Sequence, residues 1–212
     1  EFRRVPPILD VTCFGLSNGS IDLSVSGGLL PYTYAWTGGA ITEDIFNVAA
    51  GVYGVTVSDG NGCSTGGSFT VNQPTELMAS ATVFDATCFG SMTGSIDLLI
   101  SGGTSPYTVV WSNQMTTELI SQIGAGVYMV TVTDSNGCTY MNSYEVAQPT
   151  ELMGSATATD VSCFGGSDGS VSLSVSDGTT PYTYLWNTGS ALSNLVDVEA
   201  GIYMVTVTDA NQ

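Results

Sequence analysis

Residues 50–57 read Ala-Gly-Val-Tyr-Gly-Val-Thr-Val, a segment in which a glycine and a tyrosine open a run of alternating β-branched residues. The segment returns at 125–132 as Ala-Gly-Val-Tyr-Met-Val-Thr-Val and at 200–207 as Ala-Gly-Ile-Tyr-Met-Val-Thr-Val. A period of two in polarity is typical of a half-buried β-strand. A tyrosine at the start of such a strand, just after a glycine corner, indicates the tyrosine corner of two-sheet Greek-key folds. This segment therefore predicts a β-sandwich.

An internal repeat of constant length organises the whole chain. Cys13 recurs as Cys88 and Cys163, so the interval is 75 residues in each case. The same interval separates three prolines, three tryptophans and three tyrosines, namely Pro31, Pro106 and Pro181; Trp36, Trp111 and Trp186; and Tyr53, Tyr128 and Tyr203. We predict three domains, at 1–75, 76–150 and 151–212. The third is expected to lack its last strand, and an unpaired sheet edge is a template for a further segment or another chain.

Further strands can be read on the N-terminal side of the opening segment. Ile21, Leu23 and Val25 alternate with polar residues, and a strand at 31–36 begins with proline and ends with tryptophan. About seven short strands per repeat, a central tryptophan and a tyrosine corner predict an all-β chain of tandem immunoglobulin-like or fibronectin-III-like sandwiches. The connections at 73–77 and 148–152 are short and contain proline, which favours a semi-rigid rod.

Charge and composition exclude several partners. The 212 residues include 19 acidic and 2 basic side chains and no histidine, so the formal net charge is -17. Because nucleic acid is bound through lysine and arginine, we expect no binding to nucleic acid, nor to anionic lipid. No stretch approaches the roughly 18 consecutive apolar residues of a membrane span, so none is predicted in this segment.

Catalysis is hard to support with these residue types. A chain without histidine or lysine has neither an imidazole base nor a Schiff-base amine. A pair of carboxylates could still hydrolyse a glycoside, and Asp22, Asp85 and Asp97 are candidates by residue type alone. Ser172 stands at the position of Asp22 and Asp97 in the third repeat, as expected for a solvated strand position. We therefore expect no enzymatic activity and assign no catalytic residue.

Five cysteines occupy two positions of the repeat, with Cys13, Cys88 and Cys163 early and Cys63 and Cys138 late. Pairing within repeats would join Cys13 to Cys63 and Cys88 to Cys138 and leave the partner of Cys163 beyond the chain end. Pairing between repeats would join Cys63 to Cys88 and Cys138 to Cys163. We favour pairing within repeats, because a disulfide closing a loop of about 50 residues stabilises its own module by about 4 kcal/mol.

Two considerations bear on this choice of pairing. The early and late positions could lie at opposite ends of a sandwich, farther apart than the roughly 7 Å between Cα atoms that a disulfide spans. Buried free thiols are an alternative, whereas zinc is disfavoured because the chain has no histidine. Oxidised cysteines would indicate an extracellular compartment.

A turn with two oxygen-bearing side chains follows the opening segment in every repeat. The residues are Asp59 and Asn61, Asp134 and Asn136, and Asp209 and Asn211. Such oxygens suit calcium, which is the one cofactor that the sequence suggests. Asp-x-Asn-Gly is also favourable turn chemistry in its own right, and we favour this second interpretation.

The strand that ends in tryptophan carries several aromatic side chains. They are Tyr32, Tyr34 and Trp36; Tyr107 and Trp111; and Tyr182, Tyr184 and Trp186. If exposed, this face would form a stacking platform for sugar rings. We favour the interpretation that the tryptophan is the core residue of the sandwich. Burial of all three tryptophans would rule the platform out.

Together these segments resemble a known family. Asp-Val-Thr-Cys-Phe-Gly at 10–15, Asn-Gly-Ser-Ile-Asp-Leu at 18–23, Pro-Tyr-Thr-Tyr-Ala-Trp at 31–36 and Asp-Gly-Asn-Gly-Cys at 59–63 resemble the SprB-type repeat of gliding-motility adhesins of Bacteroidetes. The resemblance extends over nearly the whole chain. It implies a very large protein that is exported by type IX secretion, displayed on the cell surface and used for adhesion during gliding. The family offers no catalytic residues.

Three functions are consistent with these sequence features. The first is a structural stalk or fibre segment of a secreted cell-surface adhesin. The second is a polysaccharide-binding module whose partner is a surface polysaccharide or the substratum. The third is a subunit of a self-assembling extracellular filament, which would associate with further copies along a fibre.

Overall fold

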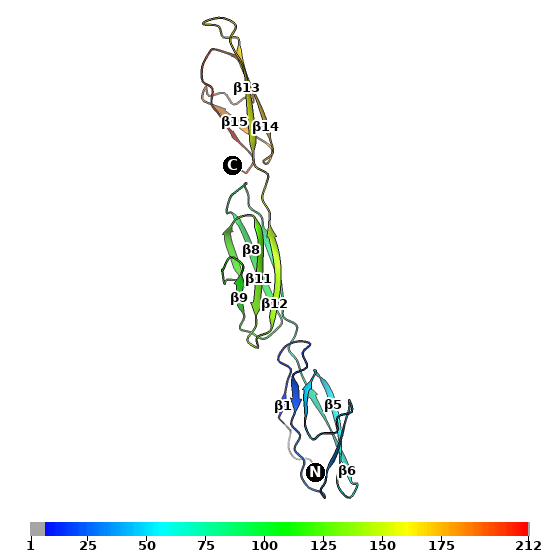
Figure 1. The fold of residues 1–212 in the computed structure, drawn as a ribbon. Coiled ribbons are helices and arrows are strands. Elements are labelled where there is room, and N and C mark those ends of the chain that lie inside the picture. Colours follow the sequence, from blue (N-terminus) through cyan, green and yellow to red (C-terminus); the bar gives the residue numbers. More distant parts are fainter. Residues whose placement is uncertain (1–6, 212) are drawn as a thin grey trace. The chain divides into compact units, whose positions relative to one another are not determined.

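The computed structural model describes residues 7–211, and among these residues every regular element is a β-strand (Figure 1). Contacts divide the chain into two compact units. The first comprises Glu1–Ser80, Leu98–Thr116 and Met129–Asn142, and the second comprises Ala81–Asp97, Thr117–Tyr128 and Ser143–Gln212. Part of repeat 2 therefore belongs to the same unit as repeat 1. No helix of the length and apolarity of a membrane span occurs in the described part of the chain.

Repeat 1 folds into two antiparallel sheets. Its strands are β1 (Ile8–Leu9), β2 (Gly19–Ile21), β3 (Thr33–Trp36), β4 (Ile45–Val48), β5 (Gly51–Ser58) and β6 (Ser64–Val71). The sheets have the orders β1-β2-β4 and β3-β5-β6. These orders correspond to strands A-B-E and C-F-G of an immunoglobulin-like sandwich that has no strand D. The predicted fold class is confirmed, with six strands rather than about seven among the described residues of repeat 1, because residues 37–44 form turns and bends.

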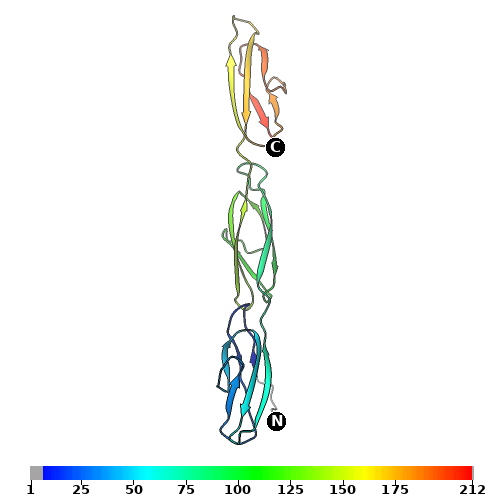
Figure 2. The same ribbon diagram turned by 90° about the vertical axis from the view of Figure 1, so that its right-hand side faces the viewer.

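The other two repeats follow the same plan (Figure 2). The strands of repeat 2 are β7 (Met78–Phe84), β8 (Gly94–Ser101), β9 (Thr108–Trp111), β10 (Leu119–Ile123), β11 (Gly126–Thr133) and β12 (Thr139–Val146). Those of repeat 3 are β13 (Met153–Thr159), β14 (Gly169–Ser176), β15 (Thr183–Trp186), β16 (Leu195–Val198) and β17 (Val205–Thr208). The sheet β15-β17 has two strands, because no described residue supplies a counterpart of β6 and β12.

The core lies between the two sheets of each repeat. In repeat 1 it consists of Val11, Ile21, Leu23, Trp36, Ile45, Val55, Val57 and Val71. The alternating pattern predicted at 21–25 is confirmed, since Ile21 and Leu23 are buried and Asp22 is exposed. Repeat 3 has a smaller core of Val171, Trp186 and Leu195, and Val205 is only half-buried where Val55 is buried.

A tyrosine corner closes the sandwich in every repeat. The hydroxyl groups of Tyr53, Tyr128 and Tyr203 donate hydrogen bonds to the backbone oxygens of Ala49 (2.8 Å), Gly124 (2.9 Å) and Glu199 (2.7 Å). Each tyrosine lies near the start of the strand that corresponds to strand F, which is the position of the tyrosine corner in immunoglobulin-like domains. The segment at 50–57 therefore has the predicted role.

Candidate functional site

The loop that carries the early cysteine of repeat 1 is held by the end of strand β6. We call residues 10–18 the early-cysteine loop. Val11 N–H donates to the Asn72 oxygen (2.9 Å), and Asn72 N–H donates to the Asp10 carboxylate (2.8 Å). Gly15 N–H donates to the Gln73 side-chain oxygen (2.9 Å). These bonds fix the loop at the C-terminal end of β6, where the chain leaves repeat 1.

The turn that carries the late cysteine of repeat 2 is organised by one carboxylate. We call residues 134–138, between β11 and β12, the late-cysteine hairpin. Asp134 is buried, and its carboxylate accepts hydrogen bonds from the N–H groups of Thr104, Asn136 and Cys138, all at 2.9 Å. A buried charge needs such partners, because desolvation without them would cost several kcal/mol. Three N–H donors therefore hold the hairpin in one conformation.

The early-cysteine loop of repeat 1 and the late-cysteine hairpin of repeat 2 are covalently joined. Cys13 and Cys138 form a disulfide with their Cα atoms 5.7 Å apart, across a sequence separation of 125 residues. Asn136 Nδ2 donates to the Thr12 oxygen (2.9 Å) and to Thr104 Oγ1 (3.0 Å). The Asn136 amide therefore bridges the two repeats beside the disulfide. We call this disulfide and the Asn136–Thr12 bond the clasp.

This disulfide overturns the favoured pairing of the cysteines. Cys13 bonds to Cys138 rather than to Cys63, so Cys138 is available neither to Cys88 nor to Cys163. Cys63 and Cys163 carry free thiols at exposed positions.

Strand length explains why pairing within a repeat fails. Cys63 precedes the first residue of β6, whereas the early-cysteine loop is bonded to Asn72, just past its last residue. A strand of 8 residues separates the two cysteines. At about 3.3 Å per residue this amounts to roughly 26 Å, far beyond the reach of a disulfide.

Apolar side chains surround the clasp. An open groove of about 480 Å³ is lined by Cys13 and Cys138 together with Phe14, Leu16, Leu77, Tyr140 and Met141, among others. Leu77 belongs to the connection between repeats 1 and 2 and is buried. The connecting segment therefore packs as part of the junction, in addition to linking the two repeats.

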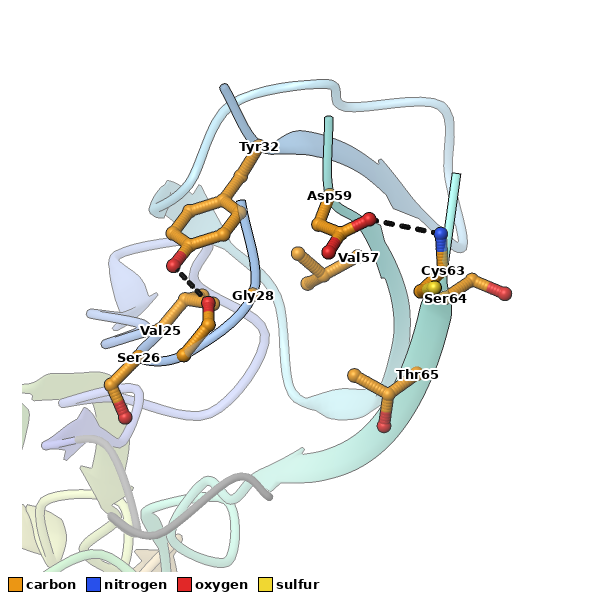
Figure 3. A pocket seen from close by; sticks show the side chains of 10 residues that line it. Val25, Ser26, Gly28, Tyr32, Val57, Asp59, Cys63, Ser64 and Thr65 are labelled. Carbon is orange, nitrogen blue, oxygen red and sulfur yellow. Dashed lines mark hydrogen bonds between the residues drawn. The ribbon is translucent and has the colours of Figure 1, made fainter. Parts of the chain in front are cut away.

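A pocket lies at the end of repeat 1 that is opposite the early-cysteine loop, and Figure 3 shows Tyr32, Asp59 and Cys63 in its lining. Two of its polar side chains are engaged within the repeat, since the Tyr32 hydroxyl donates to the Gly27 oxygen and Asp59 accepts from Cys63 N–H (2.9 Å). In repeat 2 the linker residue Leu77 lies against Gly103, the counterpart of Gly28 in this pocket. The counterpart of Leu77 in repeat 1 is Phe2, outside the described residues, so we assign the pocket no ligand.

The loop carboxylates suggested for calcium are used within their own turns. Asp59 accepts hydrogen bonds from the N–H groups of Leu29, Asn61 and Cys63, and the bond from Leu29 contributes most to lowering the pKa of Asp59. Asp209 accepts from Thr179 and Asn211 in the same way. No group of three or more acidic or cysteine side chains that could hold a metal occurs in the described part of the chain. Calcium binding stays a prediction, and the observed bonds are those of turn chemistry.

The three tryptophans are core residues. Trp36, Trp111 and Trp186 are only 4%, 2% and 2% exposed. The indole N–H groups of Trp36 and Trp186 donate to the oxygens of Thr42 (2.9 Å) and Leu192 (2.8 Å). A buried indole offers no face to a sugar ring, so these residues cannot form the stacking platform considered from the sequence. Tyr32, Tyr34, Tyr107, Tyr182 and Tyr184 are partly buried or occupy core-facing strand positions.

Solved structures with some likeness to the chain contain immunoglobulin domains. The amphioxus IgVJ-C2 molecule is 14% identical, with a TM-score of 0.30, over 61% of this chain and 95% of that one. The eight N-terminal Ig domains of Down Syndrome Cell Adhesion Molecule are 13% identical, with a TM-score of 0.43, over 82% of this chain and 32% of that one. The complex of Dpr2 Ig1-Ig2 with DIP-Theta Ig1-Ig3 contains a chain 9% identical, with a TM-score of 0.34, over 99% of this chain and 95% of that one. These scores are low, so the fold assignment rests on the sheets described above.

Sequence families give the more informative comparison. No curated protein sequence matches the chain. The family model of the SprB repeat matches it at residues 7–41, 80–116 and 155–191, which together make up just over half of the chain. Each match covers the early cysteine of one repeat, its second strand (β2, β8 or β14) and the strand that ends in tryptophan (β3, β9 or β15). The chain therefore belongs to the SprB repeat family.

Proposed function

We propose that this chain is a structural stalk segment of a large secreted cell-surface adhesin. The observation that carries the proposal is the clasp, because a disulfide between neighbouring repeats adds a covalent restraint to a junction otherwise held by one short linker and non-covalent contacts. Inter-domain contacts in most proteins are small and polar and permit relative motion. A covalent bond at such a contact suits a segment that transmits force or maintains spacing.

The polar residues of the chain support a role without catalysis. The carboxylates of Asp10, Asp59 and Asp134 accept backbone N–H groups within loops and turns. Catalytic carboxylates need access to a substrate and an environment that tunes their pKa values toward the operating pH. These carboxylates stabilise turns instead, and the sequence has no histidine or lysine that could act in their place.

The disulfide also supports an extracellular location, because disulfides persist in oxidising compartments. Membership of the SprB family favours display on the cell surface. The specific link to gliding motility and to type IX secretion is part of the proposal and derives from the family resemblance.

Small-angle X-ray scattering of the chain tests whether it acts as a spacer. A single compact domain of 212 residues would have a radius of gyration of about 17 Å. Three sandwiches in series, each roughly 35 Å long for an eight-residue strand and its turns, would give roughly 30 Å. We expect the larger value, unchanged on dilution. A value near 17 Å would contradict a stalk, and growth with concentration would favour a self-assembling subunit instead.

A further inference from the structure

A second set of contacts like those of the clasp begins one repeat further along the chain. Cys88 is the early cysteine of repeat 2, and its Sγ lies 3.7 Å from the backbone oxygen of Asn211. Asn211 is the counterpart of Asn136, because the two positions differ by one repeat of 75 residues. The turn of repeat 3 that corresponds to the late-cysteine hairpin therefore lies against the early cysteine of repeat 2.

The turn at Asn211 has the internal bonds of the late-cysteine hairpin. Asn211 Nδ2 donates to Thr179 Oγ1 (2.9 Å), as Asn136 Nδ2 donates to Thr104 Oγ1 (3.0 Å). Asp209 accepts from Asn211 N–H (3.0 Å), as Asp134 accepts from Asn136 N–H (2.9 Å). Two turns of the same conformation thus meet the early cysteines of the repeats that precede them.

The phenylalanine that follows each early cysteine gives independent support. Phe14 lines the groove beside the clasp and is 49% exposed, whereas Phe164 is 109% exposed. Cys163, beside Phe164, is also exposed. Cys163 and Phe164 are therefore uncovered, whereas the hairpin of the next repeat partly covers Cys13 and Phe14.

We propose that the early cysteine of each SprB repeat forms a disulfide with the late cysteine of the next repeat, so that consecutive repeats are clasped one to another. The rule assigns Cys88 to the position that directly follows Gln212. In a longer array of such repeats, the rule would pair Cys163 with the late cysteine of a repeat on its C-terminal side and Cys63 with the early cysteine of a repeat on its N-terminal side. The partner surface at both positions is another repeat of this family. The inference rests on junction geometry and is independent of the stalk proposal.

Each new bond forms by thiol–disulfide exchange. A cysteine thiolate attacks a low-molecular-weight disulfide such as oxidised glutathione and releases one thiol. The thiolate of the partner cysteine then displaces the second thiol from the mixed disulfide. Two cysteines thereby lose two protons and two electrons, and one molecule of the reagent is reduced to two thiols.

The test adds one cysteine directly after Gln212 and leaves the rest of the chain unchanged. The protein is equilibrated in a glutathione redox buffer, alkylated and digested without reduction, and its disulfides are identified by mass spectrometry. We expect the added cysteine to be bonded to Cys88, the Cys13–Cys138 bond to be present as well, and Cys63 and Cys163 to be alkylated. A chain with a serine added after Gln212 is the matched control and should contain only the Cys13–Cys138 bond.

Two results would overturn the rule. One is an added cysteine that is alkylated, or distributed among Cys63, Cys88 and Cys163, in a chain that has formed Cys13–Cys138. The other comes from the Cys13→Ser variant, which does not depend on the added residue. In this variant we expect Cys138 to be alkylated. A disulfide between Cys138 and either Cys63 or Cys88 would show that pairing is not set by the junction.

Discussion

At the scale of single residues, one aspartate position organises the turn that follows strand F in every repeat. Asp59, Asp134 and Asp209 each accept at least two backbone N–H groups. Hydrogen bonds to an ionised acceptor are roughly twice as strong as neutral ones. At Asp59 these bonds favour the ionised form of the carboxyl group and so lower its pKa. The residues that first suggested calcium thus set the shape of the turn that bears the late cysteine.

This role predicts a dependence of stability on pH at Asp59. Its pKa in the folded chain is lowered, chiefly by the Leu29 N–H, below the value of about 3.9 that is usual for an unfolded aspartate. Its contribution to stability is therefore fully present above the unfolded pKa and is lost as the pH falls through the folded pKa. We expect the carboxyl ¹³C shift of Asp59 to titrate below about pH 3.9, as an NMR titration would record.

The matched variant is Asp59→Asn, which keeps one side-chain oxygen acceptor and removes the charge. Its unfolding free energy should fall less steeply between about pH 5 and pH 2 than that of the parent chain. A carboxyl group of Asp59 that titrates at or above about 3.9 would contradict the assigned hydrogen bonds.

At the scale of elements, the sequence predicted most of the strands but not the junction between repeats. Alternation at 50–57 placed strand β5 correctly, because burial of one sheet face imposes a period of two. Alternation at 21–25 predicted which side chains are buried, but β2 ends at Ile21 and the residues after it are not in a strand. The tyrosine corner and the core position of Trp36 followed from the same patterns. The pairing of Cys13 with Cys138 did not, because a local period shows which face of a sheet a side chain occupies and gives no information on which loops of neighbouring repeats meet. The position of the early-cysteine loop is set by a long-range contact, the hydrogen bond from Asn72 N–H to Asp10, which are 62 residues apart in the sequence.

The sheet β15-β17 leads to a prediction at the same scale. Strand β5 pairs with β3 on one side and β6 on the other, whereas β17 pairs with β15 alone among the described residues. Alternate N–H groups of Val205–Thr208 therefore lack a ladder partner on the outer edge. We expect these amides to exchange with solvent at least about 10-fold faster than those of Val55 and Val57, as hydrogen exchange followed by NMR would show.

The internal control is strand β5 in the same spectrum. Equal protection of β5 and β17 would contradict an open edge. If such protection decreased on dilution, a second copy of the chain would be supplying the missing strand, as the filament hypothesis requires.

At the scale of the whole molecule, the clasp determines how the array carries tension. Without it, force would pass only through short linkers such as 73–77. With it, the residues between Cys13 and Cys138 form a closed covalent loop, and tension bypasses most of repeats 1 and 2. A segment of this kind resists extension even when its individual sandwiches unfold, which is the property that a stalk requires.

Single-molecule force spectroscopy of the chain, pulled from its two termini with and without a reductant, tests this account most directly. The loop between Cys13 and Cys138 spans 125 residues, so its release adds roughly 400 Å of extended chain. We expect the oxidised chain to fall short of the reduced chain by that length, and the missing length to appear in one step on reduction. Equal lengths in both conditions, or two separate shortfalls of roughly 170 Å, as two loops of about 50 residues within the repeats would give, would contradict a clasp between the repeats.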